Sequence, residues 1–245
     1  MRQQTALERR RGGRTIIDSK RSIRIRDRCY PLLMLLTRTK VKFRLKAVNT
    51  YHALPDRPVI FAANHSAFPD MPIALRAIGR HAYIFAGKQR LPFADWLFFA
   101  CNGTVWVDRK NREDKAFSKK ALLAYLAEGQ PILWFPEGTW NLTAVQLIMP
   151  MRWGIIHVAR QAGAQIIPMA LDYDCKAQVC SVMFGSPMAG EELEDRAEGI
   201  GRLRDAMATL RWELMARHPV LCRAEVSVEG SVSGHRGIPG HRLGI

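Results

Sequence analysis

The sequence predicts an α/β fold with a layered central sheet, mixed or largely parallel, flanking helices, and a basic amphipathic segment before it. Three observations lead to this fold class. From residue 58 onward, short apolar and β-branched runs alternate with segments of helical periodicity. The 245 residues are 48% hydrophobic, which is ordinary for a domain long enough to bury a core. The excess positive charge lies almost entirely before residue 47, so the N-terminal segment differs in composition from the folded part.

Each element has its own sequence pattern. Strands are predicted from runs rich in Val, Ile, Phe and Trp, and helices from apolar residues three or four positions apart. Gly79, Gly129 and Gly163 are expected to end three helices. The last helical pattern is expected to break at the Gly-Ile-Gly of 199–201. The predicted strands are 59–63, 81–86, 103–107, 131–135, 165–172 and 179–184, and the predicted helices are 70–79, 93–100, 114–128, 155–161 and 191–218.

The charge divides the chain into regions. Residues 1–46 carry 15 Lys and Arg against three acidic residues, whereas the rest of the chain carries 22 against 19. Such an arm is attracted to polyanions. We therefore expect a basic, partly disordered or amphipathic arm at 1–46 that associates with membranes, a folded domain at 47–228 and a flexible tail at 229–245.

Two structures for the arm remain open. Its middle part suits a short helix that inserts Leu and Met into a bilayer while its arginines meet phosphates. A solvated arm followed by an edge strand explains the pattern equally well. Residues 40–46 alternate strictly between basic and apolar types, which predicts a strand with one basic face. Aromatic residues are sparse in the arm and no nucleic-acid fold signature accompanies the charge, so anionic lipid is the expected partner and nucleic acid is not.

The composition also restricts the cellular compartment in which we expect the protein. No run approaches the roughly 18 apolar residues of a membrane-spanning helix, and no signal-peptide cleavage pattern is present. The five cysteines form no C-x-x-C pair and no zinc-like group with histidine. We therefore expect free thiols in a reducing compartment and no metal site.

The motif Asn-His-x4-Asp at 64–70 is the first candidate for chemistry. His65 follows a predicted strand and Asp70 lies in the first turn of the next helix, where a carboxylate meets the positive end of the helix dipole. The chain reversal between them allows the carboxylate to orient one imidazole nitrogen and leave the other outward. A histidine held in this way suits a general base. Ser66 lacks the surroundings of a nucleophile and is expected to cap the helix.

Three further stretches fall at the ends of predicted strands, where α/β sheets place their sites. They are Gly-x-x-x-Val-x-Arg at 103–109, Phe-Pro-Glu-Gly-Thr at 135–139 and the strand 166–170 with its central Pro168. Each has a plain structural interpretation: Arg109 as a surface arginine, Glu137 as a turn carboxylate and Pro168 as an edge or bulge device. Their order and spacing together with Asn-His-x4-Asp argue for a shared site.

These four stretches resemble the ordered motifs of the glycerolipid acyltransferases, in particular the 1-acyl-glycerol-3-phosphate and lysophospholipid acyltransferases. The resemblance covers about residues 45–228. It implies a membrane-associated α/β enzyme that transfers a fatty acyl group from an acyl-CoA or acyl-carrier-protein thioester to a free hydroxyl. It implies no cofactor and no metal, and a peripheral location on the cytoplasmic face of a membrane.

The resemblance also implies roles for single residues. His65 would be the general base and Asp70 its orienting carboxylate, so the substrate hydroxyl itself would be the nucleophile. Pro168 would shape the pocket wall. The implied substrate-binding residues are Asn64, Arg109, Glu137, Gly138 and Thr139, with Arg109 on the phosphate or polar head of the acceptor.

Two departures from the family pattern bear on the substrate. Trp140 and Asn141 follow the Phe-Pro-Glu-Gly-Thr motif where many members carry Arg or Ser, and Met-Arg-Trp-Gly at 151–154 replaces a basic Lys-Gly turn. They indicate either a larger or less charged acceptor than 1-acyl-glycerol-3-phosphate or a membrane-contacting loop. The predicted acceptor is 1-acyl-glycerol-3-phosphate, giving phosphatidic acid. The alternatives are another lyso-lipid (a lyso-amino-acid lipid or other lysophospholipid), a thioesterase, or a non-catalytic membrane-binding protein.

Overall fold

A computed structural model describes residues 17–39, 41–67, 69–143, 146–193 and 196–217. It contains one eight-stranded sheet in the order β1-β7-β6-β2-β5-β3-β4, with β8 paired to β6. The strands are β1 (Arg44–Ala47), β2 (Val59–Ala63), β3 (Tyr83–Gly87), β4 (Thr104–Val107), β5 (Ile132–Trp134), β6 (Gln165–Asp174), β7 (Val179–Phe184) and β8 (Met188–Ala189). Pairing is parallel except for β6 with β7 and β6 with β8. The predicted mixed, largely parallel sheet is confirmed.

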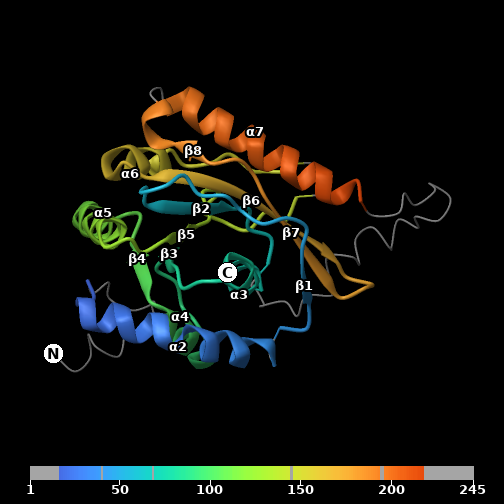
Figure 1. The fold of residues 1–245 in the computed structure, drawn as a ribbon, viewed down its shortest axis with the longest axis horizontal. Helices are drawn as coiled ribbons and strands as arrows, with labels where there is room; N and C mark the ends of the chain where they lie inside the picture. Colours follow the sequence, from blue (N-terminus) through green and yellow to red (C-terminus); the bar gives the residue numbers. More distant parts are fainter. Residues whose placement is uncertain (1–16, 40, 68, 144–145, 194–195, 218–245) are drawn as a thin grey trace.

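Helices cover both faces of the sheet. Figure 1 shows α5, α6 and α7 on one side and α2, α3 and α4 on the other. The helices are α2 (Lys20–Arg38), α3 (Asp70–Ile78), α4 (Phe93–Asn102), α5 (Arg112–Ala127), α6 (Gly154–Ala162) and α7 (Arg196–Met215), with a short 3₁₀ helix η1 (Gly190–Glu192). This arrangement is the expected layered α/β fold.

Strand β2 shows why the central strands read as continuous apolar runs. Ile60 and Ala62 join the core that includes α5, α6 and α7, whereas Phe61 and Ala63 join the core that includes α3 and α4. Successive side chains of a strand point to opposite faces, and here both faces are buried. A strand buried on both sides carries no polar alternation, so it is recognised by its length and its β-branched content.

The basic N-terminal segment contributes two described elements. Helix α2 begins after Ser19, whose side chain accepts a hydrogen bond from the Ser22 amide at 3.3 Å. It contacts α3 and α4, and the Tyr30 hydroxyl donates to the Leu75 carbonyl at 2.6 Å. Of the alternating stretch predicted as a strand at 40–46, residues 44–46 belong to the edge strand β1, which lies beside β7. The predicted division at residue 46 falls inside β1, and residues 1–16 and the tail from 218 lie outside the described part of the chain.

One local prediction is wrong and another is half right. Helix α7 continues through 199–201 without a break, because Gly199 serves close packing: a Cβ there would lie 3.2 Å from the Leu193 Cβ. Pro168 is not on an edge strand, since β6 is flanked by β2 on one side and by β7 and β8 on the other. The bulge alternative fits: Pro168 lies where the pairing slips by one residue, so that residues 185–187 of the partner side oppose residues 167–168 of β6. Its missing N–H faces the gap between β7 and β8, where its carbonyl accepts from the Gly185 amide at 2.8 Å.

Within the described ranges, every helix is too short or too polar to cross a bilayer.

Candidate functional site

His65 and Asp70 form a hydrogen-bonded pair beyond the carboxyl end of β2. His65 Nδ1 lies 2.9 Å from Asp70 Oδ2, and the Asp70 side chain is fully buried. The same oxygen accepts from the backbone amides of Ser66 at 2.5 Å and Ala67 at 2.8 Å. The residue that precedes α3 is Pro69, which offers no side-chain cap, so the expectation that Ser66 caps this helix is wrong. The Asp70 carboxylate thus holds the turn between β2 and α3 through its hydrogen bonds to His65, Ser66 and Ala67.

The outer nitrogen of His65 contacts a tryptophan. Trp140 Nε1 donates to His65 Nε2 at 2.7 Å, with the two rings perpendicular. Because an indole N–H is a donor only, Nε2 is the acceptor and the ring proton resides on Nδ1, which donates to Asp70. The Phe135 ring packs against the imidazole at 4.4 Å between centroids. The imidazole is therefore fixed in orientation and in tautomer.

A tyrosine that the sequence motifs do not include donates a further hydrogen bond to the Asp70 carboxylate. The Tyr173 hydroxyl, at the end of β6, donates to Asp70 Oδ1 at 2.5 Å. The pKa of Tyr173 is raised well above its usual value, first by burial and then by the charge of Asp70. The hydroxyl thus stays protonated and remains a donor. Asp70 and Tyr173 are 103 positions apart, and no local pattern marks the tyrosine.

Asn64 links two strand ends. It is fully buried, and its side-chain amide donates to the Leu171 carbonyl at 3.0 Å while its oxygen accepts from the Leu171 amide at 2.7 Å. Both halves of the amide are thereby used by the backbone of β6. In this structure Asn64 holds the end of β2 against β6 just before His65.

Glu137 links two loops. Its side chain follows β5 and is buried, with Oε1 accepting from the His65 amide at 2.9 Å and Oε2 from the Met149 amide at 2.7 Å. Burial raises the pKa of Glu137, and these two N–H donors together with the charge of Arg211 counteract that rise. The carboxylate fixes the backbone of the histidine from the side opposite Asn64.

Arg109 lies over the glycine of the Phe-Pro-Glu-Gly-Thr motif. Its Nη1 donates to the Gly138 carbonyl at 2.6 Å. Gly138 has a φ of 70°, and a Cβ at this position would lie 3.0 Å from that same Nη1, so glycine is required both for the turn and for the close approach. A guanidinium carries five N–H donors, and this bond uses one of them.

Positive charge gathers at Arg109. Burial lowers the pKa of Arg109, and the neighbouring charge of Arg152 lowers it further. Arg152 belongs to the 151–154 segment that differs from the family pattern, and sequence reasoning did not assign it a role. Thr139 is exposed next to Gly138. Two arginines near one another favour an anion between them.

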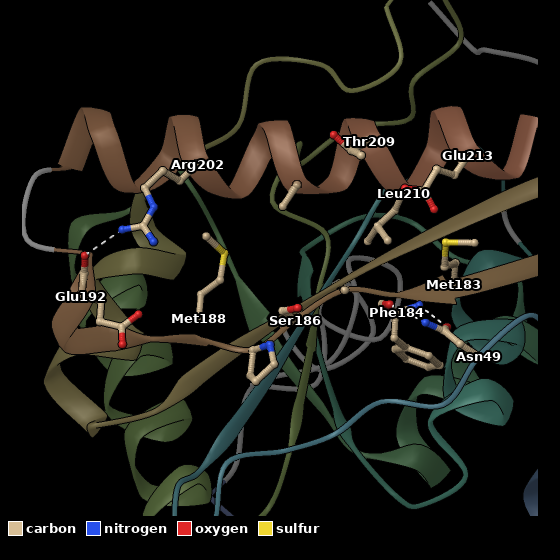
Figure 2. Close-up of a pocket in the computed structure, with 13 residues that line it drawn as sticks. Asn49, Met183, Phe184, Ser186, Met188, Glu192, Arg202, Thr209, Leu210 and Glu213 are labelled. Atoms are coloured by element: carbon tan, nitrogen blue, oxygen red, sulfur yellow. Dashed lines mark hydrogen bonds between the residues drawn. The ribbon is translucent and has the colours of Figure 1, made fainter. Parts of the chain in front are cut away.

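A pocket of about 550 Å³ lies elsewhere, between α7 and the strands β7 and β8. Figure 2 shows Arg202 and Leu210 pointing from α7 toward the strands, Arg202 on the side of Met188 and Leu210 on the side of Met183. Arg202 donates to the Glu192 carbonyl at 3.2 Å. None of the predicted site residues lines this pocket. Among the described residues, no group of three or more His, Cys, Asp and Glu side chains is placed to hold a metal.

Comparison with known proteins identifies the family. The model of the Acyltransferase family matches residues 44–172, more than half of the chain, and the chain belongs to this family. The fold resembles the crystal structure of the 1-acyl-sn-glycerophosphate acyltransferase PlsC from Thermotoga maritima, with a TM-score of 0.64 over 80% of this chain and 83% of that one. At 16% identity this likeness concerns the fold.

Several named relatives match about half of the chain. A 1-acyl-sn-glycerol-3-phosphate acyltransferase of Chlamydomonas reinhardtii is 31% identical over 120 residues, 48% of this chain and 35% of that protein. The corresponding protein of Saccharomyces cerevisiae is 30% identical over 48% of this chain and 40% of its own length. A lyso-ornithine lipid O-acyltransferase of Pseudomonas aeruginosa is 28% identical over 49% and 45%. The chain thus spans less than half the length of each of these three relatives.

Proposed function

We propose that this protein is an O-acyltransferase that moves a fatty acyl group from an acyl-CoA or acyl-carrier-protein thioester to the hydroxyl of a lysophospholipid. The proposed acceptor is 1-acyl-glycerol-3-phosphate and the product phosphatidic acid. The observation that carries the proposal is the His65–Asp70 pair, held in one tautomer at the end of β2. Membership of the Acyltransferase family and the names of the relatives support it.

In this mechanism His65 acts as the general base. Its Nε2 takes the proton of the acceptor hydroxyl while that oxygen attacks the thioester carbonyl. The tetrahedral intermediate then collapses, the carbon–sulfur bond breaks, and the leaving thiolate takes the proton back from His65. Asp70 stabilises the transient imidazolium and keeps Nδ1 protonated. The acyl group passes directly between substrates, without an acyl-enzyme.

Arg109 is proposed to bind the acceptor phosphate. Its planar guanidinium can hold two phosphate oxygens at once, and the Gly138 carbonyl fixes it on one side. Arg152 adds charge, and the exposed Thr139 adds a hydroxyl at the same edge. We propose positioning roles for Asn64 and Glu137, in place of the substrate contact that the resemblance implied, because their polar atoms bind backbone groups.

The proposed location is the cytoplasmic face of a membrane, attached through α2. Its outward residues Leu32, Leu35 and Leu36 are 56–59% exposed, and Arg24 and Arg28 are exposed on the same helix. Phe93 and Leu97 of the neighbouring α4 are also exposed. A helix with this composition can place its leucines among acyl chains and its arginines at anionic headgroups.

Vesicle sedimentation tests this surface. Leu35→Ser combined with Leu36→Ser should weaken binding to phosphatidylglycerol-containing vesicles by more than about tenfold, since each leucine loses roughly 1.5–3 kcal/mol of burial. Met215→Ser on α7, which is 41% exposed, is the matched control. Equal binding of both variants would rule out α2 as the attachment surface.

The function is tested by acyl transfer from labelled acyl-CoA and acyl-carrier protein to a panel of lyso-lipids. His65→Ala should lower transfer by about 10²- to 10⁴-fold. His52→Ala is the matched control, because His52 is exposed and precedes β2 at the opposite end of the strand. Vesicle binding without transfer to any acceptor would favour a non-catalytic membrane protein, and release of fatty acid in place of transfer would favour a thioesterase.

A second acceptor class has one specific observation in its favour. The Pseudomonas aeruginosa relative is named for a lyso-ornithine lipid. Such a lipid lacks the phosphate for which Arg109 is suited. Transfer to 1-acyl-glycerol-3-phosphate should depend strongly on Arg109, whereas transfer to a lyso-amino-acid lipid should largely survive Arg109→Ala. Comparing both acceptors with this one variant separates the two substrates.

A further inference from the structure

We infer that Trp140 is a specificity-determining residue that closes the base nitrogen of His65 to water and yields only to a bound acceptor. The inference rests on the proposed function, in which His65 Nε2 accepts the proton of the acceptor hydroxyl. It concerns a position at which this chain carries an aromatic residue directly after the Phe-Pro-Glu-Gly-Thr motif.

The acceptor lone pair of His65 Nε2 is already occupied in this structure. A neutral imidazole has one N–H and one acceptor nitrogen. In this structure Nδ1–H is directed to Asp70 and Nε2 accepts from the Trp140 indole at 2.7 Å. Only 13% of the His65 side chain is exposed. A hydroxyl or water that is to lose its proton to Nε2 must first displace the indole.

The backbone beside Trp140 is held by hydrogen bonds. The Asn141 amide donates to the His65 carbonyl at 2.6 Å, which ties the backbone next to Trp140 to the histidine. Asn141 is buried, and its side-chain amide donates to the carbonyls of Gln146 at 2.9 Å and Leu147 at 3.3 Å. Arg211 of α7 donates to the same Leu147 carbonyl. The backbone is thus fixed and the Trp140 side chain is half-buried, so a bound acceptor would reach Nε2 by turning this side chain outward without moving the backbone.

The reaction that competes with acyl transfer is hydrolysis of the thioester by water. If water reaches Nε2, His65 takes its proton, the hydroxide oxygen attacks the thioester carbonyl, the carbon–sulfur bond breaks, and the thiolate recovers the proton. The products are a free fatty acid and a thiol, and the acyl donor is wasted. Water brings no binding energy with which to move the indole. A lyso-lipid that is held by its headgroup and its chain does bring binding energy, and part of that energy can displace the indole and open the site.

Trp140→Phe tests this inference, because it keeps an aromatic side chain at position 140 and removes the pyrrole ring with its N–H. Without acceptor, hydrolysis of acyl-CoA should rise about two- to tenfold, the factor that one hydrogen bond represents. Transfer at saturating acceptor should not rise in parallel, because a bound lipid has already displaced the indole in the wild type, so the ratio of hydrolysis to transfer should increase. Trp212→Phe, a 62% exposed tryptophan of α7, is the matched control.

The outcomes separate this inference from the proposed function. If His65→Ala leaves transfer intact, the proposed function fails. If transfer depends on His65 but Trp140→Phe hydrolyses acyl-CoA no faster than Trp212→Phe does, the inference alone is overturned. Adding His65→Ala to Trp140→Phe must abolish the extra hydrolysis, and extra hydrolysis that persists would also overturn it.

A measurement without turnover gives an independent answer. Diethyl pyrocarbonate modifies the free nitrogen of a neutral imidazole, and peptide mass mapping reports the rate at His65 alone. We expect this rate to rise about two- to tenfold in Trp140→Phe and to be unchanged in Trp212→Phe. Equal rates in both variants would show that the indole does not close Nε2 in solution.

Discussion

The Tyr173 hydroxyl donates to one oxygen of the Asp70 carboxylate at 2.5 Å, while His65 bonds to the other at 2.9 Å. Two segments far apart in the chain, the end of β6 and the loop after β2, therefore share one buried carboxylate. The two backbone amides before α3 add to the set. Asp70 is held so completely that its orientation, and with it that of His65, is fixed by the fold.

Tyr173→Phe should lower kcat about three- to tenfold and leave KM for both substrates nearly unchanged, because one hydrogen bond that orients the base pair is lost. Asp70→Asn should cost more, since the amide favours the wrong imidazole tautomer. Steady-state kinetics with saturating acyl donor measures both. Tyr51→Phe, whose ring packs on Phe61, is the matched control. A rise in KM without a fall in kcat would contradict the positioning role.

The strands and the motif residues were predictable because their causes are local. Apolar β-branched runs mark β2 to β7, and the Asn-His-x4-Asp spacing brings Asp70 back to His65 within one turn. The contacts of Tyr173 and Trp140 arise between residues 103 and 75 positions apart, so they depend on the tertiary arrangement of the sheet. The sequence predicts that Gly199 breaks the last helix, but α7 continues through it, and an added Cβ there would lie close to Leu193, which precedes the helix.

Glu137→Gln should destabilise the protein by about 1–3 kcal/mol, because the amide can accept from only one of the two buried N–H groups and leaves the other unpaired. The affected donors are the amides of His65 and Met149. Urea unfolding at neutral pH measures the loss. Glu213→Gln, exposed on α7, is the control and should change stability little. A loss no larger than that of the control would mean that the Glu137 bridge does not hold the two loops.

The stability difference between wild type and Glu137→Gln should change with pH in a definite direction. Burial raises the pKa of Glu137 above the value in the unfolded chain, so the folded protein binds more protons between those two pKa values. Stability due to this group is present below the unfolded value and is lost as the pH rises through the folded one. The difference in unfolding free energy between wild type and Glu137→Gln should therefore shrink as pH rises across this window. A constant difference would contradict the raised pKa.

Gly138→Ala should impair binding of a phosphate-bearing acceptor. The methyl group would meet Arg109 Nη1 at 3.0 Å and the backbone would be strained at a φ of 70°. Gly129→Ala separates the two effects, because Gly129 has a φ of 71° with nothing within 4 Å of the added Cβ. Both should lose about 1–2 kcal/mol of stability. Only Gly138→Ala should raise KM for 1-acyl-glycerol-3-phosphate, and an equal KM for both variants would argue against Arg109 as the phosphate ligand.

Tyr30→Phe should weaken the attachment of α2 and change its alkaline stability. The Tyr30 hydroxyl donates to the Leu75 carbonyl of α3, and burial raises its pKa to about 12 from an ordinary value of 10.0. The folded protein then retains a proton that the unfolded chain loses first. Stability from this group is thus full below about pH 10 and falls as the pH rises toward about 12. Replacing the tyrosine removes that contribution, so thermal unfolding of wild type and Tyr30→Phe should converge over this interval. A difference in Tm between wild type and Tyr30→Phe that stays constant up to pH 12 would show that the Tyr30 hydroxyl, at the contact of α2 with α3, does not lose its proton in this interval.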